Sequence, residues 1–485
     1  MGRGYATLAA LALAFVLRAA VFPIVDNKHG DAPMRALIAE RMVLEPGSAA
    51  QPRTYCQFGP LHTTLMRPFI AVDPVASRSS RLLSLLAGLL VFFPFAAFAR
   101  RVAGERAAAL ACFALAVSPL HIQASTTAAS EALYLLLWVA ALERLLAALA
   151  AGGRLWTFAL AGLLASLAAV TRYDAWLALP IMVLAALILS PGPLRVRVRG
   201  LALFSLCAAV LPAAWLVWGA RAGGDALFFA HYIMTDHADL AADVAGRFGP
   251  VLGRARQLGI WVLAFVAAMT LPATVLAAGA IARGWRTLAA PARIVVIAAL
   301  APPALYLARG LLLQSFEPLA RFALVPGTLL LPLAAAVVPP TRVRAFRVAT
   351  AVAAVAFSVA VWLVATVGRD RIWAGAESLG AVTRLDGEDR ELAATLRARR
   401  APHAPVMLEP LAFADIGIAH AAGVPWTESI SLIVTRTPRA TVAETMATTG
   451  ARFVAGYDHP GGWPRTLPDW PATALHIGRW RLVER

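Results

Sequence analysis

The sequence predicts a mainly α-helical protein whose helices cross a membrane many times. Hydrophobic residues make up 60% of its 485 residues and charged residues only 15%, and the mean hydropathy is +0.70. Residues 201–220 and 348–367 contain no charged side chain. An apolar run of about 17–25 residues is long enough to cross a bilayer as a helix. These observations predict a polytopic transmembrane helical bundle and argue against a soluble protein.

Apolar segments recur along the chain and predict about eleven spans. They lie at residues 5–22, 79–98, 107–120, 131–150, 155–171, 175–190, 200–219, 257–281, 294–310, 322–338 and 348–367. The first segment follows Arg3 and resembles the basic and apolar parts of a signal peptide. No convincing small-residue cleavage site follows it, so we expect it to remain in the protein as the first span.

Charged residues in the connecting loops indicate the orientation. The loops after the even-numbered spans are short and basic; their arginines are Arg100, Arg101, Arg106, Arg154, Arg195, Arg197, Arg199, Arg283, Arg286, Arg293, Arg342, Arg344 and Arg347. Short loops rich in arginine face the cytoplasm. We therefore expect a cytoplasmic amino terminus and an outer face that carries most of the acidic residues. The net charge of +17 reflects this topology, and no nucleic-acid partner is predicted.

The composition changes after residue 367, where the apolar spans end. Helix-like patterns at residues 388–400, 413–422 and 441–449 alternate with strand-like patterns at 406–408 and 452–457, and residues 476–482 can close a sheet. Such alternation predicts a small α/β domain. The chain is thus expected to consist of a transmembrane module at 1–367 and a soluble extracytoplasmic α/β domain at 368–485.

Several common kinds of chemistry lack their motifs in this chain. The three cysteines, Cys56, Cys112 and Cys207, do not form a disulfide framework or a cysteine-based metal site. The sequence contains no Walker loop, no GxSxG and no CxxC. A nucleotide-driven pump and a serine hydrolase are therefore disfavoured.

The first outer loop, residues 23–78, is where we expect the active site. Four charged or ionisable side chains, Asp26, Lys28, His29 and Asp31, fall within six residues. Asp31 precedes an amphipathic segment that can lie along the membrane surface. A carboxylate fixed there can act as a general base; the alternative is a solvated loop aspartate.

Glu131 is a second candidate, at the outer end of the fourth span. An ionisable group at the edge of a span is costly unless it has a partner or faces a water-filled cavity. It can orient the partner of Asp31 or share a metal ion with it. The alternative is a carboxylate that is stabilised by the positive end of the helix dipole.

Two pairs of opposite charges lie at the outer ends of later spans. Arg172 and Asp174 fall between the fifth and sixth spans, and Glu317 and Arg321 precede the tenth. The guanidinium fork of arginine matches phosphate oxygens, so each arginine is a candidate for holding a lipid phosphate. Alternatively, each arginine snorkels to the surface or pairs with the nearby acid.

Metal binding is left open by the sequence. His231, Asp236, His237, Asp239 and Asp243 cluster in the long outer loop before the eighth span. Their spacing matches no zinc signature, so no metal ligand is assigned. The sequence does not decide whether a divalent metal ion is a cofactor.

Several short motifs follow one another in the order of a known superfamily. They are Asp31 in the first outer loop, Phe58-Gly59-Pro60-Leu61-His62, the segment Ser80 to Gly88 led by Arg81, the stretch from Ser118-Pro119 to Glu131, and Arg321-Phe322 with Pro326. In order and sidedness the chain resembles the GT-C superfamily of polytopic glycosyltransferases, especially the protein O-mannosyltransferase and lipid A aminoarabinose transferase group. It departs from that group in having Asp31-Ala32 where Asp-Glu is frequent, and Gly59-Pro60 where Pro-Pro is frequent.

The resemblance implies a GT-C-like enzyme of a bacterial inner membrane. Such an enzyme transfers a hexosyl or pentosyl group from a polyprenyl-phosphate carrier to a lipid, glycan or protein acceptor on the outer face. It implies Asp31 as the base of an inverting displacement and Glu131 as a second catalytic acid. The substrate-binding candidates are Lys28, His29, His62, Arg172, Asp174, Glu317 and Arg321.

Two other classes of function compete with this reading. Acids and arginines in membranes also serve the pathways of transporters and lipid flippases, but the chain shows no inverted repeat. A noncatalytic assembly scaffold is the third possibility, and it leaves the cluster from Asp26 to Asp31 without a purpose.

Overall fold

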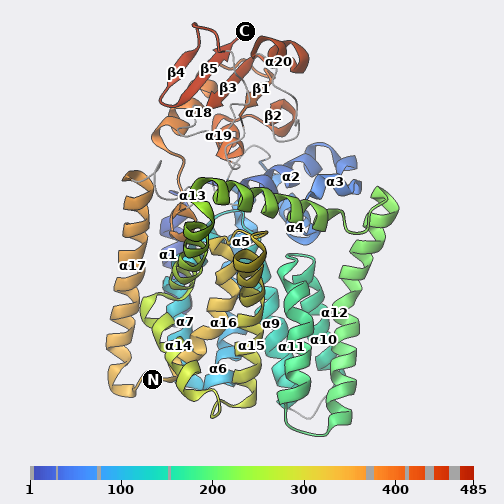
Figure 1. Ribbon diagram of the computed structural model, residues 1–485, viewed down its shortest axis with the longest axis vertical. Coiled ribbons are helices and arrows are strands. Elements are labelled where there is room, and N and C mark those ends of the chain that lie inside the picture. The colour runs from blue at the N-terminus through green and yellow to red at the C-terminus, as the bar shows by residue number, and fades with distance from the viewer. Residues whose placement is uncertain are drawn as a thin grey trace.

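A helical bundle carries a small α/β domain at one end (Figure 1). The computed structural model describes residues 5–28, 31–73, 78–150, 154–367, 376–409, 414–431, 442–457 and 470–485. Within these residues the chain is mainly helical, with one small sheet near the carboxyl terminus. The predicted fold class is confirmed at this level.

The bundle is built from long apolar helices. They are α1 (Tyr5–Val21), α5 (Leu82–Leu90) with α6 (Phe92–Ala103), α7 (Glu105–Val117) with α8 (Pro119–Thr126), α9 (Glu131–Ala150), α10 (Leu155–Ala169), α11 (Asp174–Leu189), α12 (Leu194–Gly223), α13 (Phe228–Met269), α14 (Leu271–Gly284), α15 (Ala290–Ala308), α16 (Leu324–Ala336) and α17 (Val343–Val367). Among the described residues, six helical segments are long and apolar enough to cross a membrane, or seven if the bent pair α7–α8 is one span. Five further apolar helices are shorter. The protein is therefore an integral membrane protein, and the count of eleven spans stays a prediction.

Short helical turns join these elements. They are η2 (Ser79–Arg81), the π-helical η3 (Arg309–Leu313), η4 (Ala320–Ala323), η5 (Pro340–Arg342) and η6 (Ala376–Leu379). Both η3 and η4 lie between α15 and α16, in the loop that carries Glu317 and Arg321.

One predicted helix is interrupted. We expected residues 257–281 to form one continuous helix, but α13 ends at Met269 and α14 begins at Leu271. Thr270 between them has a φ of 72°, and Pro272 stands in the first turn of α14. Proline has no N–H to continue the hydrogen-bond ladder. The expectation of an unbroken helix was therefore wrong, because apolar periodicity does not register this break.

Two arginines support a second break, where α7 and α8 meet at an angle of 61°. Arg18 donates to the carbonyl oxygen of Ala116 at 3.1 Å, next to the bend. Arg81 donates to the carbonyl oxygen of Thr126 at 3.2 Å, at the end of α8. Backbone carbonyls without partners are costly inside a bilayer. These contacts stabilise the bent segment that leads to the start of α9.

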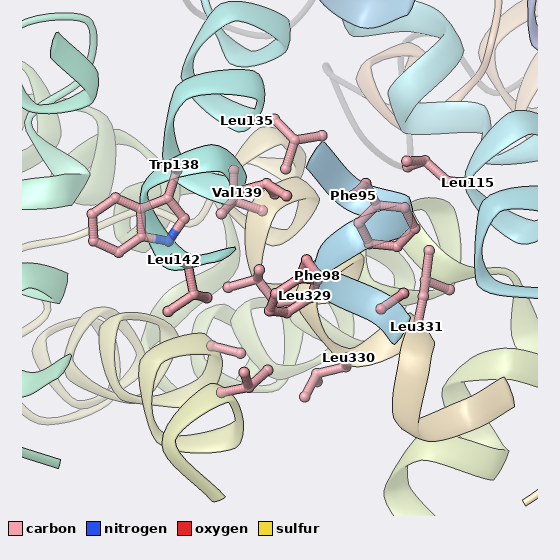
Figure 2. Packing of buried hydrophobic residues seen from close by; sticks show 14 of the residues in the cluster. Phe95, Phe98, Leu115, Leu135, Trp138, Val139, Leu142, Leu329, Leu330 and Leu331 are labelled. Atoms are coloured by element: carbon pink, nitrogen blue, oxygen red, sulfur yellow. The ribbon is translucent and has the colours of Figure 1, made fainter. Parts of the chain in front are cut away.

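The core of the bundle is apolar and tightly packed (Figure 2). In Figure 2 the phenylalanines of α6 lie near leucines of α16 and near Val139 of α9, whereas the ring of Trp138 points away from them. Figure 2 labels Phe95, Phe98, Leu115, Leu135, Trp138, Val139, Leu142, Leu329, Leu330 and Leu331. This dense packing holds the outer ends of α9 and α16 in fixed positions.

The first outer loop forms a layer of helices between the bundle and the α/β domain (Figure 1). It contains α2 (Ala32–Leu44), η1 (Pro46–Ala50), α3 (Pro52–Tyr55) and α4 (Pro60–Ile70). The amino end of α4 rests on the turn between α10 and α11, where the N–H of Leu61 donates to the carbonyl oxygen of Val170 at 3.2 Å. A side chain on Gly59 would place its Cβ 2.4 Å from that same oxygen.

The close approach at Gly59 gives a testable prediction. Gly59→Ala forces two backbone segments apart, because the carbonyl oxygens of Val170 and Thr171 are both closer than 3.0 Å to the new Cβ. We expect a lower melting temperature in detergent and reduced turnover, since the displaced turn carries Arg172. Gly47→Ala in the same loop is the control, because no atom of the described residues lies within 4 Å of its Cβ position. Equal stability of the two variants would show that the contact is not constrained.

The carboxyl-terminal domain is a five-stranded sheet with helices. Its elements are α18 (Gly387–Arg399), β1 (Val406–Leu408), α19 (Ala414–Ala422), η7 (Trp426–Glu428), β2 (Ser429–Ser431), α20 (Val442–Thr449), β3 (Phe453–Tyr457), β4 (Leu475–Ile477) and β5 (Trp480–Glu484). The strand order is β2-β1-β3-β5-β4. Strand β1 is parallel to β2 and β3, whereas β5 is antiparallel to β3 and β4. The segment expected to close the sheet forms two strands. The boundary predicted at residue 368 falls outside the described residues and stays a prediction.

Polar contacts join this domain to the first outer loop. The amine of Lys28 lies 2.9 Å from a carboxylate oxygen of Asp386 and 3.7 Å from one of Asp389. Asp26 and Thr383 pair through their backbones, with the N–H of Asp26 donating at 2.8 Å. On α2, Glu40 lies 2.9 Å from Nε2 of His420. The domain is therefore attached to the same loop that carries Asp31.

Candidate active site

A cavity of about 570 Å³ lies at the end of the bundle next to the α/β domain, which is the end predicted to face outward and is called the outer end below. Its walls come from α2, the outer ends of α9, α11 and α15, η4, and the outer part of α13. The outer part of α13 is the segment 228–248, which precedes a kink at Gly249 with a φ of 70°. Ser378 and Thr383, which precede the α/β domain, also line it. The ionisable residues in its wall are Asp31, Arg35, Glu131, Arg172, Tyr173, Asp174, Asp236, His237, Tyr306, Arg309 and Arg321.

Acids and arginines alternate along one side of the cavity. Arg321 lies 2.9 Å from Asp31 and 3.7 Å from Glu131. Arg172 lies 2.5 Å from Glu131 and 2.7 Å from Asp174. All five side chains are at most 20% exposed. The structure thus brings together residues that are separated by up to 290 positions in the chain.

Each of the three acids lies at the amino end of a helix. Asp31 directly precedes α2, Glu131 is the first residue of α9, and Asp174 is the first residue of α11. The amino end of a helix carries a partial positive charge that stabilises a carboxylate. Each acid therefore sits where its own backbone favours the ionised form.

Surrounding charges keep Asp31 ionised. Burial by itself would raise the pKa of this carboxyl group, but the guanidinium groups of Arg321, Arg35 and Arg172 outweigh it and lower the pKa below the ordinary value of 3.8. Nearby positive charge favours the charged form of an acid. At neutral pH Asp31 is thus an anion that can accept a proton.

The donor set does not fit a divalent metal ion. The carboxylates of Asp31, Glu131 and Asp174 all face arginines. In the part of the chain that the structure describes, no three histidine, cysteine, aspartate or glutamate side chains are placed to hold a metal. A divalent ion requires oxygen or nitrogen ligands that point to one centre.

Three other predicted site residues that the structure describes, Lys28, His62 and Glu317, do not line the cavity. Lys28 is at the domain junction, and Glu317 pairs with Arg256 of α13. His62 is fully buried in α4, with Nε2 3.3 Å from the hydroxyl of Ser84. Burial, together with the charges of Arg35 and Arg172, holds the pKa of His62 well below its usual value. His29 falls outside the described residues. Substrate binding by these four residues stays a prediction.

The comparisons with known proteins agree with this architecture. Residues 57–218 match the family model of dolichyl-phosphate-mannose-protein mannosyltransferases, and no curated sequence matches the chain. ArnT from Cupriavidus metallidurans bound to undecaprenyl phosphate has a TM-score of 0.67 and 16% identity, over 99% of this chain and 98% of that chain. The oligosaccharyltransferase AglB from Archaeoglobus fulgidus, in complex with an inhibitory peptide and a dolichol-phosphate, has a TM-score of 0.56 and 13% identity, over 94% of this chain and 69% of that chain.

The chain has the GT-C fold of membrane glycosyltransferases. The resemblance stated from the motifs is thereby confirmed.

Within this GT-C fold the structure adds site residues that the sequence did not single out. Tyr306 donates to Asp174 at 2.7 Å, and Arg309 lines the cavity next to Phe316. His237 stacks on Phe316 with ring centres 4.4 Å apart. Burial and the charge of Arg321 lower the pKa of His237 to about 4, so its ring is neutral. Spacing marked His237 only as a weak metal candidate, since its place in the cavity depends on how the outer part of α13 folds back.

Proposed function

We propose that this protein is a glycosyltransferase that moves a hexosyl or pentosyl group from a polyprenyl-phosphate carrier to an acceptor on the outer face of the membrane. The observation that carries the proposal is the cavity at the outer end of the bundle, where the row of acids and arginines meets an apolar wall. A lipid-linked sugar needs both surfaces at once. The proposed location is a bacterial inner membrane, with the cavity and the α/β domain outside the cytoplasm.

The apolar wall suits the isoprenoid part of such a donor. It is formed by α11 and the outer part of α13, with Trp176, Leu177, Ile233 and Met234 facing the cavity. Tyr173 and Phe229 stack beside them with ring centres 4.1 Å apart. Burial of apolar surface contributes about 25 cal/mol per Å², so this wall favours a hydrocarbon chain over a water-soluble nucleotide sugar.

Arginine supplies the positive charge for the phosphate. The Nε of Arg321 is buried and has no hydrogen-bond partner within the described part of the chain, and Arg309 lines the same cavity. Negative charge develops on the leaving phosphate as the glycosidic bond breaks, and fixed donors lower the barrier most when they are aimed at that charge. Arg321 and Arg309 are thus assigned to the phosphate, and Arg172 holds Glu131 and Asp174 in place.

Asp31 is assigned as the base. The acceptor oxygen attacks the anomeric carbon, its proton passes to Asp31, and the bond from that carbon to the phosphate oxygen breaks to release the polyprenyl phosphate. Arg321 takes part both in the proton transfer and in the departure of the phosphate. Before the reaction it contacts Asp31, and it is also assigned to the phosphate. As Arg321 turns to the leaving phosphate, Asp31 loses part of its counter-charge and becomes more basic. This coupling offsets the low resting basicity of the carboxylate.

The test is turnover of labelled polyprenyl-phosphate sugars by purified protein in proteoliposomes. We expect release of polyprenyl phosphate from at least one donor. Asp31 must be ionised, and its pKa in the free protein lies below 3.8. We therefore expect kcat/KM, which reports the free protein, to stay constant as the pH falls from neutral and to decline only below that value. An acidic limb near pH 6 would assign the base to another group. Lipid movement between leaflets without turnover would favour a flippase instead.

A further inference from the structure

Arg35 is a buried cation that is poorly satisfied by its neighbours. Its side chain is 3% exposed, and its Nη2 lies 3.9 Å from Oδ2 of Asp31. The Nε and Nη1 atoms have no hydrogen-bond partner among the residues that the structure describes. The ring of Phe58 lies 4.4 Å below the guanidinium carbon, which attracts the charge but accepts none of its in-plane N–H groups. Buried donors without acceptors are costly.

These unpartnered donors belong to the wall of the cavity. Arg35 lines it together with Gln57 and Phe58. Arginine presents five N–H donors in a fixed fork, and a carboxylate or phosphate satisfies two of them at once. The unpartnered N–H groups of Arg35 would therefore be satisfied by an oxyanion bound within the cavity.

The position of Arg35 relative to Asp31 separates it from the phosphate of the donor. Arg321 contacts Oδ1 of Asp31, whereas Arg35 faces Oδ2. In an inverting displacement the base and the attacking group lie on the face of the sugar opposite to the leaving group. With Arg321 on the side of the leaving phosphate, Arg35 lies on the side of the acceptor.

We propose that Arg35 binds an anionic group of the acceptor, a carboxylate or a phosphate, close to the hydroxyl that is glycosylated. The proposal rests on the glycosyltransferase function proposed above. Asp31 directly precedes α2 and Arg35 follows four residues later in its first turn, about 6 Å along the helix axis. The anion and the reacting hydroxyl therefore belong to the same or neighbouring units of the acceptor. When Asp31 takes up the proton, the acceptor's anion replaces it as the counter-charge of Arg35.

The test measures two kinds of binding to protein in nanodiscs. The first is the Kd of undecaprenyl phosphate. The second is the binding of glucuronate, glucose 6-phosphate and glucose, followed by ligand-observed NMR with the nanodiscs saturated with undecaprenyl phosphate. We expect the wild type to bind at least one anionic probe about tenfold more tightly than glucose. Whether glucuronate or glucose 6-phosphate binds better distinguishes a carboxylate from a phosphate.

Variants of Arg35 test whether this residue causes the preference for an anionic probe over glucose. Arg35→Met should abolish the preference and leave the Kd of undecaprenyl phosphate within about twofold, while Arg35→Lys keeps part of it because the charge remains. Arg41→Met is the matched control, since Arg41 is on the same helix but is partly exposed and pairs with Glu45. A melting curve confirms that each variant is folded.

The possible failures are distinct. Loss of undecaprenyl phosphate binding in Arg35→Met, with the probes unchanged, would place Arg35 in the donor site and overturn the proposal. No preference for either anion in the wild type would also overturn it. Failure of the wild type to bind undecaprenyl phosphate would instead refute the proposed function.

Discussion

Replacement of Asp31 by asparagine is expected to lower turnover by about 10²- to 10⁴-fold, the range lost when a general base is removed. Asparagine keeps the shape of the side chain but accepts no proton from the acceptor. It also removes the charge that pairs with Arg321 and Arg35. The measurement is release of polyprenyl phosphate in proteoliposomes, with the Kd of undecaprenyl phosphate measured in parallel.

The control for this variant is Asp73→Asn. Asp73 is an exposed residue in the same outer loop, so we expect turnover within about twofold of the wild type. A folded Asp31→Asn protein with wild-type turnover would remove Asp31 from the chemistry. Glu131 would then be the next carboxylate to test, because it contacts both Arg172 and Arg321.

Arg172→Met is expected to cause the largest loss of stability among the site variants. It leaves Glu131 and Asp174 without their shared guanidinium, although both are mostly buried. Breaking a buried ion pair by removing one partner costs about 3–5 kcal/mol, because the remaining charge is uncompensated. Unfolding of detergent-solubilised protein by heat or denaturant measures the change.

A double variant separates lost charge balance from lost packing. Arg172→Met combined with Glu131→Gln removes one acid together with the arginine, and we expect it to regain part of the lost stability. If the double variant is less stable than Arg172→Met by the full cost of Glu131→Gln alone, the two residues do not interact energetically. Both proteins should be inactive, because neither holds the row of charges in place.

Several of the acids and arginines that line one side of the cavity could be predicted from their position at the outer ends of the predicted spans. Glu131, Arg172 and Arg321 each follow from one rule, that charged residues at the outer ends of spans gather on one side of the membrane. The structure places them within ion-pair distance of one another. The rule does not predict which acid pairs with which arginine, because the pairs depend on how the helices pack in the bundle.

Other residues could not be placed from the sequence, for physical reasons. Lys28 binds acids that come more than 350 positions later, and no local pattern encodes that partner. Arg35 was not singled out, because helical periodicity identifies one face of a helix but not what covers that face. The outer part of α13 supplies His237 only because it crosses over the cavity.

The attachment of the carboxyl-terminal domain to the first outer loop determines when this enzyme can be completed during synthesis. Lys28 is made near the beginning of translation, and its partner Asp386 follows 358 residues later. At about 5–20 residues per second, this interval lasts about 20–70 s. Throughout that time the loop carrying Asp31 is already at the membrane, but the segment that roofs its cavity has not been made. In a nascent chain the carboxylate proposed as the base therefore lies in an incomplete site, and the site closes only when the last quarter of the chain has been made.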